Sequence, residues 1–186
     1  MQFESPVQRL QWVGGRYVVG YSENDSEVQV FNSENESVMR FRIDNGVTAK
    51  NGSMDPLAKY FAVSTTDGYA FIFVLPNEGT NIGELVKKVK ITKLKLEAFG
   101  SNPFEISWTP DGSALLVSGE NNLGVINRYT WEINYSKDFA HKKPISCISW
   151  LTDSVLATAG LDKIIKIWDF PARTLTNYII SQLEVI

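Results

Sequence analysis

The sequence predicts an all-β fold built from a repeated antiparallel unit, and three observations support this prediction. Short runs rich in Val, Ile, Phe, Tyr and Trp alternate with turns that contain Gly, Asp, Asn or Pro. An aromatic residue recurs at Phe31, Phe73, Tyr129 and Trp168, at intervals of 42, 56 and 39 residues. No segment shows a convincing helical period of 3.6 residues. A repeat of about 40 residues that contains only strands indicates a stack of similar small sheets.

The unit is a strand, a polar turn, a second strand rich in small and β-branched residues, another polar turn, and a third strand that ends in an aromatic residue. In chain order its copies comprise "VQRLQW", "RYVVGYS" and "VQVFN", then "GVTAKNGS", "YFAVST" and "YAFIFVL", then "PFEISW", "ALLVSG" and "LGVINRYTW", and last "PISCISW", "VLATAG" and "IIKIWDF". The turns between first and second strands, such as "TPDGS", hold residues that favour tight turns. With an outer strand added, the expected units are about 6–43, 45–96, 102–136 and 141–182.

Each unit carries more apolar surface than it can bury alone, so neighbouring units must stack radially around a channel. The predicted architecture is therefore a β-propeller with four recognisable four-stranded blades. The long interval before the third unit holds the insertion "LPNEGTNIGELVKKVKITKLKLEAFGSN", which we expect around an outer strand.

Four polar or aromatic residues of the last unit identify the type of blade. His141 precedes the first strand, Thr158 lies in the second, Asp162 in the next turn and Trp168 in the third. These positions resemble those of a WD repeat, and the resemblance implies a buried hydrogen-bond relay through the four side chains. The third unit has Tyr129 in place of the Trp, and the first two have Phe, so three blades are degenerate.

The number of blades raises a question of closure. WD propellers commonly close with about seven blades, and a shorter stack leaves sheet faces and edges bare. We expect the four blades to be part of a ring of about seven. Three arrangements would complete the ring. Further sequence outside this chain could supply the missing blades, or partner chains such as a second copy could do so. In the third arrangement the four blades close by themselves with unusually steep packing.

A narrower resemblance covers residues 37–170. The stretch "INRYTWEINYSKDF" places a basic residue and then a Trp after the third strand, and in this respect the chain resembles the N-terminal propeller of the replisome adaptor family. This is the chromosome transmission fidelity protein four and acidic nucleoplasmic DNA-binding protein group. The resemblance implies a non-catalytic nuclear scaffold that links the replicative helicase to DNA polymerase alpha. The alternatives are a cytoplasmic location and a WD scaffold of another complex, in ribosome assembly or a ubiquitin ligase.

The candidate protein-binding residues are Arg128, Tyr129 and Trp131, with Tyr135 nearby. Tyr, Trp and Arg dominate interface hot spots because they bury a large area and keep a polar group. Strand alternation predicts Tyr129 and Trp131 on one side and Arg128 on the other. The alternative is that these aromatic residues pack against the next blade.

A lysine run provides a weaker candidate for nucleic-acid contact. Its members are Lys87, Lys88, Lys90, Lys93 and Lys95. Lysines on an exposed outer strand discourage edge-to-edge aggregation and need no ligand. The alternative is a salt-sensitive contact with DNA phosphates.

Composition excludes several other functions. The net charge of -3 gives no general attraction to nucleic acid or to anionic membranes. With one histidine, His141, and one cysteine, Cys147, no zinc cluster can be assembled, so we expect no metal and no cofactor. Cys147 lies in an apolar strand and is expected in the core. A hydrolase with clustered acids at the channel mouth is the remaining enzymatic alternative, and no nucleophile motif supports it.

Overall fold

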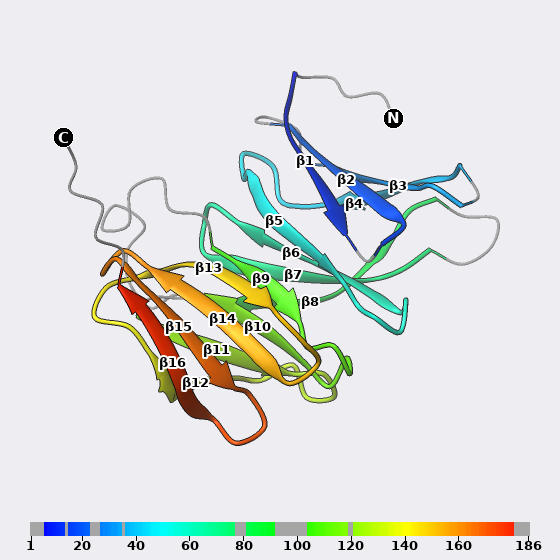
Figure 1. Cartoon of the computed structure of the whole chain (residues 1–186). Helices are drawn as coiled ribbons and strands as arrows, with labels where there is room; N and C mark the ends of the chain where they lie inside the picture. The colour runs from blue at the N-terminus through cyan, green and yellow to red at the C-terminus, as the bar shows by residue number, and fades with distance from the viewer. Residues whose placement is uncertain are drawn as a thin grey trace.

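The computed structural model of the chain describes residues 6–13, 15–22, 27–34, 36–76, 81–91, 104–118 and 121–180. All regular structure within these ranges is β, in four antiparallel four-stranded sheets (Figure 1). The sheets follow one another like the blades of a propeller, which confirms the predicted fold class. The described residues include no helix long and apolar enough to cross a membrane.

Each blade is one sheet whose strands pair in chain order. The first blade comprises β1 (Val7–Val13), β2 (Tyr17–Ser22), β3 (Glu27–Asn32) and β4 (Val38–Arg42). The second comprises β5 (Ala49–Met54), β6 (Tyr60–Thr65), β7 (Tyr69–Val74) and β8 (Glu84–Lys90). The third comprises β9 (Ile106–Trp108), β10 (Ala114–Ser118), β11 (Asn122–Asn127) and β12 (Ile133–Ala140). The fourth comprises β13 (Ile145–Trp150), β14 (Val155–Gly160), β15 (Ile164–Asp169) and β16 (Thr174–Ile180).

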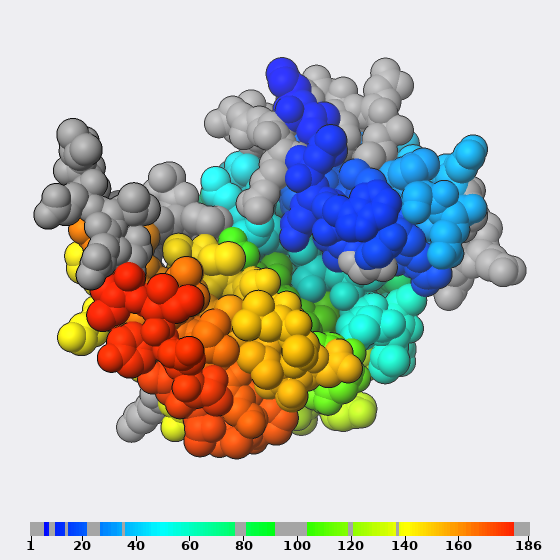
Figure 2. Space-filling model, in the orientation of Figure 1, coloured from blue at the N-terminus to red at the C-terminus, as the bar shows by residue number. Residues whose placement is uncertain are grey.

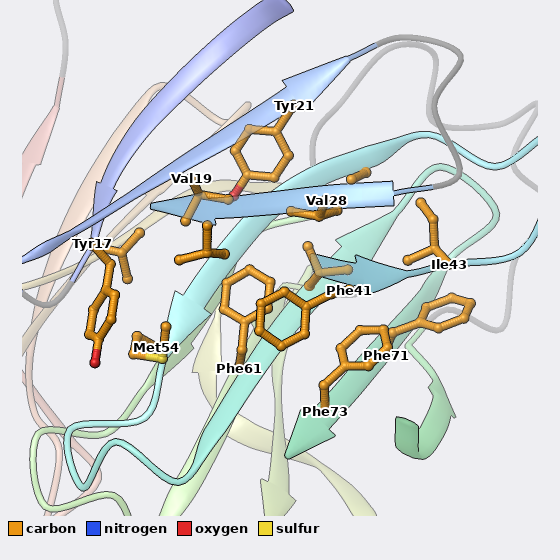
Figure 3. Packing of buried hydrophobic residues seen from close by; sticks show 14 residues of the cluster. Tyr17, Val19, Tyr21, Val28, Phe41, Ile43, Met54, Phe61, Phe71 and Phe73 are labelled. Atoms are coloured by element: carbon orange, nitrogen blue, oxygen red, sulfur yellow. The ribbon is translucent and has the colours of Figure 1, made fainter. Parts of the chain in front are cut away.

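The blades meet along their first strands and pack face against face. Strand β5 lies beside both β1 and β9, and β9 lies beside β13. Three buried apolar clusters fill the spaces between successive blades. In the first cluster the ring of Phe41 lies 4.7 Å from Phe61 and 5.4 Å from Phe73, measured between ring centroids (Figure 3). Aromatic residues from two blades therefore share one core.

A glycine makes the close approach of the first two blades possible. A Cβ atom on Gly52, in β5, would lie 2.6 Å from the hydroxyl oxygen of Tyr21 and 2.8 Å from the ring of Phe61. Any side chain at this position would displace both residues, because an aromatic ring is rigid and has to move as a whole.

The third strand of the third blade ends earlier than the sequence predicts. Strand β11 stops at Asn127, whose side-chain oxygen accepts hydrogen bonds from the backbone N–H groups of Tyr129 and Thr130 and so forms a turn. Ile126 pairs with Leu115 as Trp168 pairs with Leu156, so Ile126 and not Tyr129 is the counterpart of Trp168. The prediction that Tyr129 closes the strand is therefore wrong.

The prediction for Cys147 is also wrong, because its side chain is exposed. Cys147 lies opposite Ala159, which lies opposite Ile165, on the face of the fourth blade that no described segment covers. Trp12, 61% exposed, lies on the first blade at the other end of the stack. Figure 2 shows the first blade in blue and the fourth in orange to red at opposite ends of the visible face. Closure into a larger ring remains a prediction.

The shared core gives a prediction about stability. Replacing Phe61, which is fully buried, with Ala should lower the free energy of unfolding by about 3–5 kcal/mol, since the first two blades lose a common ring. Replacing the exposed Tyr178 with Ala is the matched control and should change it by less than about 0.5 kcal/mol. Urea unfolding followed by tryptophan fluorescence measures both, and equal losses would contradict the packing described.

Candidate functional site

The four relay residues of the fourth blade come together in one hydrogen-bonded chain. The indole N–H of Trp168 donates to the hydroxyl of Thr158 at 2.9 Å, and that hydroxyl lies 2.8 Å from Nε2 of His141. On the other side of the imidazole, Nδ1 lies 3.0 and 3.1 Å from the two carboxylate oxygens of Asp162. The chain of contacts joins β14, β15, the turn before β13 and the turn between β14 and β15.

One order of donors satisfies every polar atom of this relay. The Thr158 hydroxyl accepts from Trp168 and keeps its own hydrogen, which it can donate to Nε2 of a neutral His141. In that tautomer Nε2 carries no hydrogen, and Nδ1–H donates to Asp162. The side chains of Thr158, His141 and Asp162 are buried, so a substrate in solution cannot reach them.

Asp162 also anchors the backbone on both sides. Its carboxylate accepts from the N–H groups of Lys142 at 2.8 Å and Ile164 at 3.2 Å. Burial by itself raises the pKa of Asp162, but the hydrogen bonds from His141 and from these amides outweigh it and leave the pKa below its ordinary value. The imidazole of His141 is fully buried. The relay therefore holds the blade together.

Arg128 lies inside the stack of blades and does not face solvent. Its guanidinium forms two parallel hydrogen bonds with the carboxylate of Asp55, both 2.8 Å long, and a third with the carbonyl of Gly112 at 2.9 Å. Only 9% of the Arg128 side chain and none of the Asp55 side chain is exposed. The hydrogen bond to Asp55 raises the pKa of Arg128 further. Asp55 lies in the β5–β6 turn of the second blade, so the pair joins two blades.

Aromatic rings surround this ion pair. The guanidinium carbon of Arg128 lies 5.0 Å from the ring centre of Tyr60 and 5.5 Å from that of Trp108, within the range of cation–π attraction. Trp131 meets both rings edge to face, at 5.1 and 6.3 Å. We call Asp55, Tyr60, Trp108, Arg128 and Trp131 the arginine slot. The sequence did not indicate Asp55, because a turn aspartate normally serves its own turn.

Tyr129 is the member of the predicted rim that faces solvent, and 83% of it is exposed. It lies at the tip of the β11–β12 turn, between the buried Arg128 and the half-buried Trp131. Tyr135, also near the predicted rim, donates its hydroxyl hydrogen to the carbonyl of Ile91 at 2.7 Å. The predicted alternation is wrong here, because residues 128–130 form a turn in which strand periodicity does not apply.

The described lysines of the run lie on the outer strand β8 of the second blade. Lys88 contacts Asp44 and Asp67 and lies over the rings of Tyr69 and Phe71. Burial works to lower the pKa of Lys88, but the two carboxylates outweigh it and raise the pKa. Lys87 and Lys90 are exposed and pair with residues on opposite faces of β7, so the strand does not present one basic face. Lys93 and Lys95 lie outside the described residues.

Nothing in the described ranges resembles a metal site, since no three His, Cys, Asp or Glu side chains gather there. The two cavities we describe both lie between the third and fourth blades. One, of about 320 Å³, is lined by Thr109, Pro110, Asp111, Asp153, Phe170 and Pro171. The other, of about 230 Å³, is lined by Ala114, Val125, Asn127, Asn134, Tyr135, Ser136 and Arg173.

Comparison with known families now accounts for the relay. Residues 134–169 match the model "WD domain, G-beta repeat". The chain contains a WD repeat. The matched stretch runs from the outer strand of the third blade through β15, so the WD repeat in sequence is offset by one strand from the blade. WD propellers are typically non-catalytic scaffolds that bind protein partners.

Individual proteins are similar to this chain over different lengths. Protein HIR1 of Candida albicans is 26% identical over 190 residues, covering 89% of this chain and 21% of that protein. Protein HIR1 of Phaeosphaeria nodorum is 23% identical over 200 residues, covering 89% and 19%. A probable cytosolic iron-sulfur protein assembly protein, a CIAO1 homolog of Schistosoma japonicum, is 33% identical over 79 residues, covering 40% and 22%. The chain spans about a fifth of the length of these relatives.

The relay predicts a sharp difference between two substitutions. Thr158→Val keeps the shape but leaves Trp168 Nε1 and His141 Nε2 buried without partners, so the free energy of unfolding should fall by about 2–4 kcal/mol. Thr158→Ser keeps the hydroxyl and should cost about 1 kcal/mol for the lost methyl group. Chemical denaturation measures both, and a larger loss for Ser than for Val would exclude the relay as drawn.

The ion pair of the arginine slot predicts non-additive losses. Arg128→Met leaves the Asp55 carboxylate buried without its partner and should destabilise the chain by about 3–5 kcal/mol. Adding Asp55→Leu removes that buried charge, so the double variant should be more stable than Arg128→Met alone. A double-mutant cycle in urea checks this, and simple additivity would show that the two side chains act independently.

Proposed function

We propose that the chain is a platform for protein partners, and that a partner binds at the tip of the β11–β12 turn through Tyr129. The observation that carries the proposal is the combination of strong exposure and fixed position at this residue. Tyr129 is 83% exposed, yet its backbone N–H is held by the side chain of Asn127 at 2.8 Å.

The neighbourhood of Tyr129 supports this role. Arg128 and Trp131, on either side of the turn tip, are fixed between the second and third blades by the ion pair and by ring contacts. An aromatic side chain on such a rigid support loses little conformational freedom when a partner covers it, which favours binding. Arg128 and Trp131 then act by positioning Tyr129.

The process we propose is chromosome replication in the nucleus, with replisome subunits as partners. The support is the resemblance of residues 37–170 to the replisome adaptor family, above all in "INRYTWEINYSKDF". That stretch contains Tyr129, so the proposed contact lies in the segment that carries the resemblance. Contact with DNA through the lysine run is the weaker possibility, because Lys88 is already engaged with two carboxylates.

A second candidate is a WD scaffold of a different complex. The similarity to a probable iron-sulfur protein assembly protein favours it, as does a 32% identity over 68 residues to the p21-activated protein kinase-interacting protein 1 of Mus musculus. A WD repeat by itself specifies no process, since function lies in the surface added to the fold.

The test is an affinity pull-down from nuclear extract with the tagged chain, compared with its Tyr129→Ala variant. We expect helicase and DNA polymerase alpha subunits to be enriched, and Tyr129→Ala to lower that enrichment about fivefold to tenfold. Tyr178→Ala, which truncates another exposed tyrosine, is the matched control and should leave it unchanged.

The two parts of the proposal fail separately. Enrichment that Tyr129→Ala does not reduce would contradict the assigned contact. Enrichment of ribosome-assembly, ubiquitin-ligase or iron-sulfur assembly components in place of replisome subunits would contradict the process and support the second candidate.

A further inference from the structure

The arginine slot between the second and third blades has a structural counterpart between the third and fourth. In the slot, Arg128 follows β11 and its backbone N–H donates to the carbonyl of Ser113. In the fourth blade, Phe170 follows β15 and its N–H donates to the carbonyl of Ser154. Three residues further on, Trp131 and Arg173 share a positive φ, of 57° and 55°. Phe170 therefore stands where the previous blade has Arg128.

The preceding blade of each interface corresponds in the same way: the β5–β6 turn of the second blade matches the β9–β10 turn of the third. The N–H of Asp55 donates to the carbonyl of Tyr60 at 2.9 Å, and the N–H of Thr109 donates to that of Ala114 at 2.9 Å. Thr109 thus replaces the carboxylate and Ala114 replaces the large ring. The guanidinium of Arg128 and the ring of Tyr60 thus have no counterpart at Phe170 and Ala114.

The cavity of about 320 Å³ lies at this place. We call it the second slot. Its residues come from the β9–β10 turn of the third blade and from the β13–β14 and β15–β16 turns of the fourth, with Asp111, Asp153 and Phe170 among them. The lining residues include two carboxylates and an aromatic ring and no basic side chain. The second slot therefore offers negative charge and a ring, although from other positions than those that surround Arg128 in the first slot.

Two groups of the second slot, Asp111 and Phe170, are held in place by neighbouring residues, and the third, Asp153, lies on an exposed turn. Oδ1 of Asp111 accepts hydrogen bonds from Thr109 at 2.6 Å and from the N–H of Ser113 at 3.0 Å, and these bonds lower the pKa of Asp111, so it stays charged. The ring of Phe170 is fixed by Phe139 and Trp150, 5.5 and 5.0 Å away. Asp153, on the exposed β13–β14 turn, supplies the second negative charge.

We propose that the second slot binds an arginine side chain of a partner protein, with its guanidinium between Asp111 and Asp153 and its stem against Phe170. The proposal rests on the cavity, which lies between the blades at the place that corresponds to the first slot, and on the negative charge of its lining. A planar guanidinium matches both features, because it pairs with carboxylates and stacks on rings. The chain's own Arg173 lines the neighbouring cavity, beside Ala114 and Asn127. The proposal adds a second contact to the scaffold function.

The experiment titrates the purified chain with the peptide acetyl-Gly-Arg-Gly-amide and follows backbone amide signals by NMR. We expect Gly112, Ser154 and Phe170 to shift, with a dissociation constant of about 1–10 mM for so short a peptide. The same peptide with neutral citrulline in place of arginine should bind at least about tenfold more weakly. Equal binding of the two peptides, or no shift at these residues, would overturn the proposal.

Variants separate the second slot from other surfaces. Asp153→Asn should weaken arginine binding about threefold to tenfold, whereas Glu132→Gln, an exposed acid of the third blade, should leave it unchanged. Phe170→Arg places a tethered guanidinium where the first slot has one, so it should abolish peptide binding. Full binding by Asp153→Asn would overturn the proposal even if Phe170→Arg failed to fold.

One further variant distinguishes this proposal from the preceding one. Tyr129→Ala should bind the arginine peptide as the unaltered chain does, because Tyr129 does not line the second slot. Loss of peptide binding in Tyr129→Ala would overturn the second slot as the peptide's site. If the pull-down enriches no replisome subunits, the proposed process is contradicted, but the peptide titration still tests the second slot.

Discussion

The structure depends on a simple constraint: a small sheet cannot bury its apolar face by itself, so each blade needs a neighbour. Phe41 of the first blade and Phe61 of the second share one core at a centroid distance of 4.7 Å, and this arrangement recurs between each pair of blades. The close approach also forces polar groups out of water. Those groups must then find partners within the protein, because an unpaired buried polar group costs about 1–3 kcal/mol.

Two solutions to that second requirement coexist in the chain. Within the fourth blade, His141, Thr158, Asp162 and Trp168 satisfy one another. Between the second and third blades, Arg128 and Asp55 form a buried ion pair that aromatic rings enclose. The next interface has neither a guanidinium at Phe170 nor a carboxylate at Thr109, and a cavity lies there. The difference in side chains between two equivalent turns therefore decides whether an interface is closed or can receive a ligand.

Much of the fold and part of the site could be predicted from the sequence. The alternation of strands and turns predicted four antiparallel blades. The resemblance of one blade to a WD repeat implied the relay of His141, Thr158, Asp162 and Trp168, which are close together in the chain. The pairing of Arg128 with Asp55 could not be predicted, since 73 residues separate them and neither position has a local signature. Cys147 was placed in the core on local apolarity alone, which does not reveal which sheet face has a neighbour.

The sequence by itself determined the repeat and the all-β architecture, and the resemblance to a WD repeat implied the polar relay. Each of these features depends on residues within a single blade. Only the tertiary structure decided that Arg128 is buried, that Tyr129 is presented to solvent and that Phe170 borders a cavity. Those outcomes depend on how one blade face lies against the next. That contact joins turns of different blades, and no periodicity along the chain encodes it.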